Sequence, residues 1–424
     1  MPTLSHIKSL IKSMLPALFL MSALLSCARD EPEPFEPVEY EKFAGELFSK
    51  TVRLGDITTE ILRQFKISSI EELLLGQGVS ESEIESAISK INLYLKLAGE
   101  CEAHGITYHT TDPDGKPIIA SGVLYYPKSG RPKGVIEVVP WFKSKSECGT
   151  ANPLFMAEII PGMSSYVHIV PDQVGYGSTA DAPIGYLQYE NVAVVSADMR
   201  KAAEEFVYNH YHQKLHSSSI LFGYSLGGGG ALSLARYYGQ HPERGVKVDE
   251  IFIGGGVYDP LLVLEKQFET YHAEHAVFPN IICSWNHYED LRLDFSKVFK
   301  GKLLENYQKW CYGQYTIYEL TDFLGTNLHT YFTEEFLQKE DSPEYQSLLQ
   351  VCRQKRIPND WQPTCRIHLF HGENDMLVPA ICTDQLYDEL RGINADVTYK
   401  TYKANHWGAA PLMIVDFWKF LNNR

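Results

Sequence analysis

The chain has 424 residues, 44% of them hydrophobic, and a formal net charge of −15 at pH 7. This length is ample for one large domain that carries an insertion. The negative charge argues against nucleic acid or an anionic membrane surface as the main partner.

The N-terminus resembles the signal peptide of a bacterial lipoprotein. Lys8 and Lys12 precede a largely apolar stretch of 12 residues, 14–25, which is shorter than the ~20 residues that a membrane-spanning helix needs and suits a signal sequence. Leu24-Leu25-Ser26-Cys27 resembles a lipobox, whose cysteine is acylated after cleavage. We therefore expect removal of residues 1–26, lipidation of Cys27 and export to a bacterial outer membrane, on its periplasmic face or on the cell surface. An ordinary signal peptide with an incidental cysteine is the alternative.

Two segments separate this signal from the main domain. Residues 27–53 begin with an acidic, proline-rich run that has too few apolar residues for a core, so we expect an extended tether. Residues 54–100 have helical apolar spacing and two capping boxes, Ser68-x-x-Glu71 and Ser80-x-x-Glu83. They predict a helical segment that packs on the main domain.

From Cys101 onward, strand and helix patterns alternate, which predicts an α/β fold with a mostly parallel, doubly wound sheet. The core has two parts, 101–257 and 361–424. The predicted strands are 106–111, 116–126, 134–139, 163–170, 218–222, 251–256, 365–370 and 395–402, and the main helices are 191–208, 231–238, 382–390 and 411–421.

The sequence Gly223-Tyr224-Ser225-Leu226-Gly227 is a G-x-S-x-G motif between a predicted strand and a predicted helix. A serine hydroxyl is a poor nucleophile at neutral pH and needs both exposure and an adjacent base. A sharp strand-to-helix turn provides the exposure, and the glycines permit the turn. The motif therefore predicts Ser225 as the nucleophile of an acyl-transfer reaction.

The segment 258–360 interrupts the alternating pattern. It has few strand signals, and 18 of its 103 residues are Phe, Trp or Tyr, roughly 17% against 12% for the whole chain. We expect a helical cap insertion over the site. Most of these rings should form the core of the cap itself, and a few lining a pocket would suit an acyl chain, an aryl ester or a sugar face.

A carboxylate follows the predicted strand 365–370. The turn His371-Gly372-Glu373-Asn374-Asp375 lies at the carboxyl end of that strand, where open α/β sheets place their chemistry. We prefer Asp375 over Glu373 as the acid of a catalytic triad. We expect His371 to be a structural histidine of the turn.

The base is predicted from its position. Of the chain's 15 histidines, His406 alone follows Asp375, in a loop Asn405-His406-Trp407-Gly408 between the last predicted strand and the last helix. From there an imidazole could reach Ser225. The chain order is Ser, Asp, His, as in the triads of α/β-hydrolases.

Several segments together resemble the secretory lipase branch of the α/β-hydrolases. They are residues 120–127, 171–177 and 223–228, Trp361-Gln362-Pro363, the stretch from His371 to Pro379, and His406. The resemblance spans roughly residues 101–424. It implies a serine esterase or lipase with a mainly helical cap and no cofactor, in which Ser225 is the nucleophile, Asp375 the acid and His406 the base.

One loop departs from the family pattern. After the strand 134–139, where H-G-G or H-G-T commonly supplies one N–H of the oxyanion hole, this chain has Pro140-Trp141-Phe142. Proline has no N–H, so Trp141 and Phe142 are the candidates. The second donor is the N–H of Leu226, directly after the nucleophile.

The remaining reactive side chains give no sign of a metal site. Apart from Cys27 the chain has seven cysteines, an odd number, so at least one is unpaired or pairs between chains. His272-Ala273-Glu274-His275 lacks the spacing of a known metal-binding helix.

Together these features predict an exported serine hydrolase that cleaves small-molecule carboxylic esters through an acyl-enzyme, without cofactor or metal. Two alternatives stay open. One is a serine peptidase or amidase with the same triad, because a fold does not specify its substrate. The other is an inactive surface binding protein on a hydrolase scaffold, against which the complete triad argues.

Overall fold

The structure is a computed structural model that describes residues 35–65, 69–76, 81, 84–85, 99–358 and 360–424. The chain divides into two units, Met1–Val38 and Glu39–Arg424, and every helix and strand described below belongs to the second. The signal peptide, Cys27 and the capping-box residues Ser68, Ser80 and Glu83 lie outside the described residues.

The described residues form one nine-stranded sheet with the order β1-β2-β3-β5-β4-β6-β7-β8-β9. The pairs β1–β2, β2–β3 and β3–β5 are antiparallel, and all pairs from β5 to β9 are parallel. The strands are β1 (Phe43–Arg53), β2 (Glu100–Thr111), β3 (Pro117–Pro127), β4 (Val135–Val139), β5 (Val167–Pro171), β6 (Ser218–Tyr224), β7 (Lys247–Gly254), β8 (Arg366–Gly372) and β9 (Val397–Tyr402).

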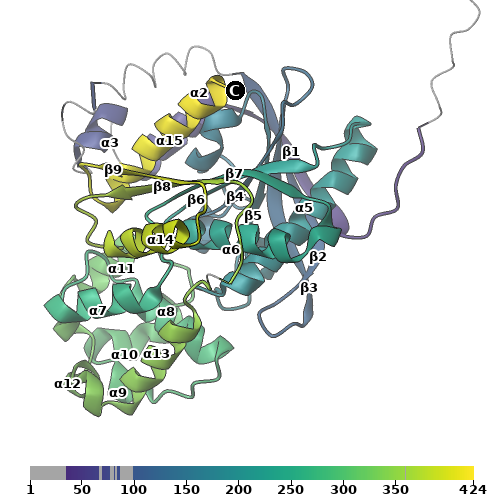
Figure 1. Cartoon of the computed structure of the whole chain (residues 1–424). Coiled ribbons are helices and arrows are strands. Elements are labelled where there is room, and N and C mark those ends of the chain that lie inside the picture. The colour runs from purple at the N-terminus through teal and green to yellow at the C-terminus, as the bar shows by residue number, and fades with distance from the viewer. Residues whose placement is uncertain (1–34, 66–68, 77–80, 82–83, 86–98, 359) are drawn as a thin grey trace, which may run out of the picture. The chain divides into compact units, whose positions relative to one another are not determined.

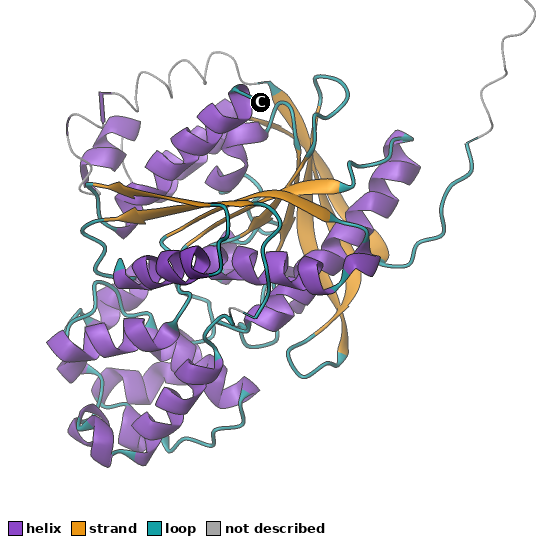
Figure 2. Ribbon diagram, viewed as in Figure 1, coloured by secondary structure: helices purple, strands orange, loops and turns teal. Residues whose placement is uncertain are grey.

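Helices cover both faces of this sheet, as Figures 1 and 2 show. One face packs against α2 and α15 through an apolar cluster that includes Ile57, Phe222 and Phe417. The other face packs against α5, α6 and α14. The bounds are α2 (Leu54–Phe65), α3 (Ile70–Gly76), α5 (Tyr189–Tyr211), α6 (Leu226–Gln240), α14 (Ile381–Gly392) and α15 (His406–Asn422). The predicted α/β class with a mostly parallel, doubly wound sheet is confirmed.

The segment between β7 and β8 is helical, as the fold prediction requires. Its helices group together beside α14 (Figure 1), and the described residues there form no strand longer than an isolated bridge. The helices of this segment are α7 (Pro260–Thr270), α8 (Phe278–Tyr288), α9 (Phe295–Val298), α10 (Gly301–Trp310), α11 (Ile317–Leu324), α12 (Glu334–Leu337) and α13 (Pro343–Gln354). Fully buried rings, among them Phe268, Phe332 and Phe336, form the core of this cap.

Three local expectations need correction. Residues Phe43–Arg53, expected in the tether, form the edge strand β1, because they pair with β2 and Val52 is fully buried. Strand β5 begins at Val167 instead of residue 163, because the preceding residues turn back onto Gly162. The last helix begins at His406, which was expected in a loop, because the Asn405 side chain caps it by accepting from the Gly408 N–H at 2.9 Å.

The strand register brings the carboxyl ends of the central strands together. Val139 of β4 lies opposite Gly223 of β6, and Gly254 of β7 lies opposite both Tyr224 of β6 and Phe370 of β8. The residues that follow these strands therefore meet at one edge of the sheet, beneath the cap.

Candidate active site

Ser225 occupies a strained turn between β6 and α6. Its φ of 55° and ψ of −125° lie in a region that side chains other than glycine rarely adopt. The turn is so tight that a Cβ on Gly223 would lie 2.0 Å from the Gly227 oxygen, and a Cβ on Gly227 would lie 2.1 Å from the Val139 oxygen. Only glycine fits at either position. The two glycines permit this turn, and the turn places the serine at the carboxyl edge of the sheet.

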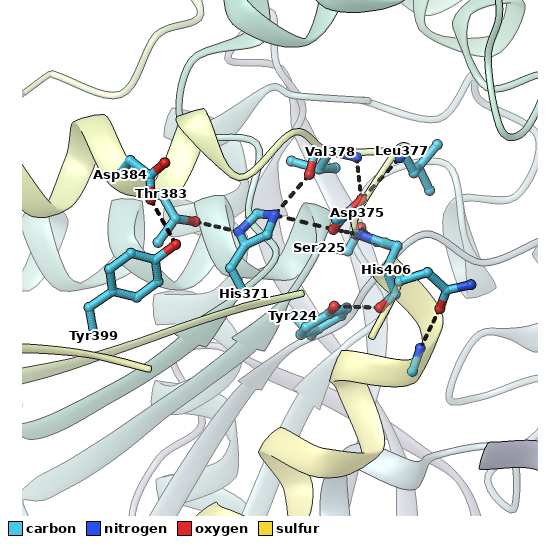
Figure 3. A network of polar contacts seen from close by, with 12 residues as sticks. Tyr224, Ser225, His371, Asp375, Leu377, Val378, Thr383, Asp384, Tyr399 and His406 are labelled. Carbon is cyan, nitrogen blue, oxygen red and sulfur yellow. Dashed lines mark hydrogen bonds and ion pairs between the residues drawn. The ribbon is translucent and has the colours of Figure 1, made fainter. Parts of the chain in front are cut away.

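Ser225, His406 and Asp375 form one hydrogen-bonded chain, drawn in Figure 3. The Ser225 Oγ lies 2.8 Å from the His406 Nε2, and the His406 Nδ1 lies 2.6 Å from the Asp375 Oδ2. Since an ionised carboxylate only accepts hydrogen bonds, the proton of the neutral imidazole resides on Nδ1. The Nε2 lone pair is then free to accept from the serine hydroxyl.

The Asp375 carboxylate is held by four donors. Its Oδ1 accepts from the backbone N–H groups of Leu377 and Val378, and its Oδ2 accepts from His406 and, at 3.2 Å, from the Nε2 of His371. Burial alone would raise the pKa of this carboxyl. The charge that His406 carries when it is protonated, together with the hydrogen bonds from His371 and His406, outweighs the effect of burial. These interactions lower the pKa of Asp375 to about 2. Asp375 is therefore ionised at neutral pH.

His371, expected to be a structural histidine of the turn, lies against the carboxylate of Asp375. It is fully buried, its Nδ1 lies 2.6 Å from the Thr383 Oγ1, and its Nε2 lies 2.8 Å from the Val378 oxygen as well as facing Asp375. The Val378 carbonyl only accepts, so the proton must be on Nε2, and Nδ1 accepts from the threonine. The position of His371, four residues before Asp375 at the end of a buried strand, is the signal that could have identified this contact.

Glu373, the rival acid, faces another direction. It is exposed, and its carboxylate accepts from the Thr401 hydroxyl at 2.8 Å. The two carboxylates of this turn therefore lie in different environments. Asp375 is buried against His406, whereas Glu373 lies on the side of β9.

The cap contacts the candidate site through Trp407. The indole N–H of this residue, which directly follows His406, donates to the His275 Nε2 at 3.1 Å. Burial and the nearby His406 lower the pKa of His275 to about 4, so its imidazole is neutral and able to accept at neutral pH. The segment 272–275 therefore contacts the neighbour of the candidate base. Among the described residues, no group of His, Cys, Asp and Glu side chains is arranged to hold a metal ion.

A cavity of about 580 Å³, counted with its opening to solvent, lies between Ser225 and the cap. Leu226 and Phe142 line it together with the serine, and Phe142 stacks on Tyr186 at 5.0 Å between ring centroids. Trp141 instead lines a neighbouring cavity, where the Lys143 Nζ lies 4.5 Å from its ring centroid. Of the two oxyanion candidates, Phe142 is thus the one that lines the same cavity as the serine. The other lining residues are Leu187, Val257, Val263, Gln267, Val277, Phe278, Ile281, Ile317, Leu377, Val378 and Trp407.

Comparison with solved structures identifies the fold. The rice cell wall degrading esterase LipA from Xanthomonas oryzae superposes with a TM-score of 0.68 at 16% identity, over 89% of this chain and 97% of that one. Lipase A of Candida antarctica superposes with a TM-score of 0.53 at 12% identity, over 72% and 73% of the two chains. The chain has the α/β-hydrolase fold. No family model and no curated protein sequence matches it.

Placed on the α/β-hydrolase fold, the three residues Ser225, Asp375 and His406 occupy the carboxyl edge of the sheet, where such folds carry their triads. All seven cysteines of the described part carry free thiols. No helix of the described residues is long and apolar enough to span a membrane.

Proposed function

We propose that this protein is an exported serine hydrolase that cleaves carboxylic esters through an acyl-enzyme on Ser225. The observation that carries the proposal is the buried chain from the Ser225 Oγ through His406 to Asp375, with separations of 2.8 and 2.6 Å. Two carboxylic-ester hydrolases among the structures of the same fold, the LipA esterase and the Candida lipase, support an ester substrate over an amide.

The geometry suits a two-step acyl transfer. His406 takes the proton from Ser225 as the oxygen attacks the ester carbonyl, and Asp375 stabilises the imidazolium that forms. The N–H of Leu226, with that of Phe142 in preference to Trp141, stabilises the tetrahedral oxyanion. His406 then protonates the departing alcohol, and a water molecule activated by the same imidazole releases the acid and restores the serine.

The substrate range is tested by profiling the purified protein on nitrophenyl esters of increasing chain length, acetylated sugars and peptide anilides. We expect butyrate esters to have a higher kcat/KM than palmitate esters, because the rings of Phe142, Tyr186 and Trp407 line the cavity at the serine and should leave little room for a long acyl chain. Cleavage of anilides faster than esters would favour the peptidase alternative. A clear preference for palmitate would indicate a lipase whose cap opens onto a deep acyl tunnel.

We further propose that Cys27 anchors the protein to a bacterial membrane. Replacing it (Cys27→Ser) should abolish acylation and move the protein from the membrane fraction to the soluble fraction. One acyl chain binds a membrane only marginally, and stable anchoring needs more than one, so the mature cysteine should carry several. Mass spectrometry of the mature N-terminus measures this directly. An unmodified cysteine, or cleavage at another residue, would contradict the proposal.

A further inference from the structure

Among the described residues, the wall of the cavity at Ser225 contains one buried side-chain oxygen that can only accept a hydrogen bond and has no partner. Gln267 of α7 is only 3% exposed and lines this cavity. Its Nε2 donates to the Leu377 oxygen at 2.9 Å. Because a carbonyl oxygen accepts only, this bond fixes which arm of the amide is nitrogen. The other arm, Oε1, has no hydrogen-bond partner among the described residues.

An unpaired buried acceptor needs a physical explanation, since nearly all buried polar atoms in proteins are hydrogen-bonded. The other polar side chains of the wall differ from it. The Ser225 hydroxyl is engaged with His406, and the Trp407 N–H is engaged with His275. The Tyr186 hydroxyl also has no partner among the described residues, but it can donate as well as accept, so it selects neither a donor nor an acceptor. Gln267 Oε1 accepts only and therefore selects a donor.

The other residues that line the cavity define the polarity and charge of the group that binds there. Their side chains are apolar, including Val257, Val263, Phe278 and Ile281, and no charged side chain of the described residues lines the cavity. An ionised group would be buried there without a counter-charge, which is costly. The preferred group is therefore neutral and apolar, with one hydrogen-bond donor.

We infer that the cavity selects esters whose cavity-bound part is an apolar group bearing one hydroxyl, and that Gln267 recognises this hydroxyl through Oε1. The inference rests on the proposed ester hydrolase function and specifies its substrate class. If the cavity binds the acyl part of the ester, the hydroxyl belongs to the acyl chain. If it binds the alcohol part, the hydroxyl belongs to the alcohol.

Paired substrates distinguish the two sides. One pair compares ethyl hexanoate with ethyl hexanoate hydroxylated at the chain end. The other compares hexyl butyrate with the monobutyrate of the corresponding diol. In one pair, the wild type should hydrolyse the hydroxylated member with a kcat/KM about fivefold higher, the size expected of one neutral hydrogen bond. Gln267→Met keeps the approximate volume of the side chain and should abolish this preference by slowing the hydroxylated member alone.

Val263→Ala is the matched control, because Val263 lies one turn away on α7 and lines the same cavity without a polar atom. It should change both members of each pair by the same factor. Equal kcat/KM values for the two members of both pairs in the wild type would overturn the inference. An equal loss for both members in Gln267→Met would also overturn it, because the glutamine would then serve only to hold the Leu377 backbone. If no ester is hydrolysed at all, the proposed function fails and the inference with it.

Discussion

Replacing Ser225 by alanine is expected to lower kcat for ester hydrolysis by about 10⁶ while leaving the protein folded. Alanine removes the attacking oxygen, and within the described part of the chain the hydroxyl bonds to His406 alone. The substitution also keeps a Cβ in the same backbone conformation. Steady-state kinetics give the loss, and circular dichroism establishes that the fold persists. A fluorophosphonate should label the wild type at Ser225 and leave Ser225→Ala unlabelled.

The exposed Ser217, just before β6, provides the control for this substitution. Ser217→Ala should retain both activity and labelling. Because nucleophile and base act as a unit, His406→Ala should be as impaired as Ser225→Ala, and the double variant should be little worse than either. Labelling at another serine, or losses that multiply in the double variant, would contradict the assignment.

Asp375→Asn is expected to lower kcat by about 10⁴, the scale seen when a triad aspartate is replaced by its amide. The neutral amide removes the charge that stabilises the imidazolium. The NH₂ group of the asparagine also favours the wrong tautomer of His406. Because this group only donates, the amide cannot accept hydrogen bonds from all four groups that donate to the Asp375 carboxylate. The value of kcat measures the total loss, and the pH–rate profile measures the change in the ionisation of the base.

Glu373→Gln is the matched control, because it makes the same chemical change two residues away on the same turn. Glu373 is exposed and bonded to Thr401, so this variant should keep most of its activity. The opposite result, an inactive Glu373→Gln beside an active Asp375→Asn, would identify Glu373 as the acid.

The sequence is informative where function depends on local backbone geometry. The G-x-S-x-G motif predicts the turn at Ser225 because only glycine tolerates the close contacts of positions 223 and 227. Asp375 is predictable because it follows a buried strand, and carboxyl ends of parallel strands share one edge of the sheet. His406 is predictable from chain order, although the pattern wrongly indicates a loop where Asn405 starts a helix.

The sequence by itself therefore determined the α/β class, the helical cap and the three candidate catalytic residues, because periodicity and turn chemistry are local properties of the chain. Only the tertiary structure decided which side chains complete the site. Trp407 contacts His275 because the first turn of α15 meets the cap. Gln267 and Phe142 reach the cavity from separate elements. These contacts join residues up to 132 positions apart, and no local pattern specifies such distant pairs.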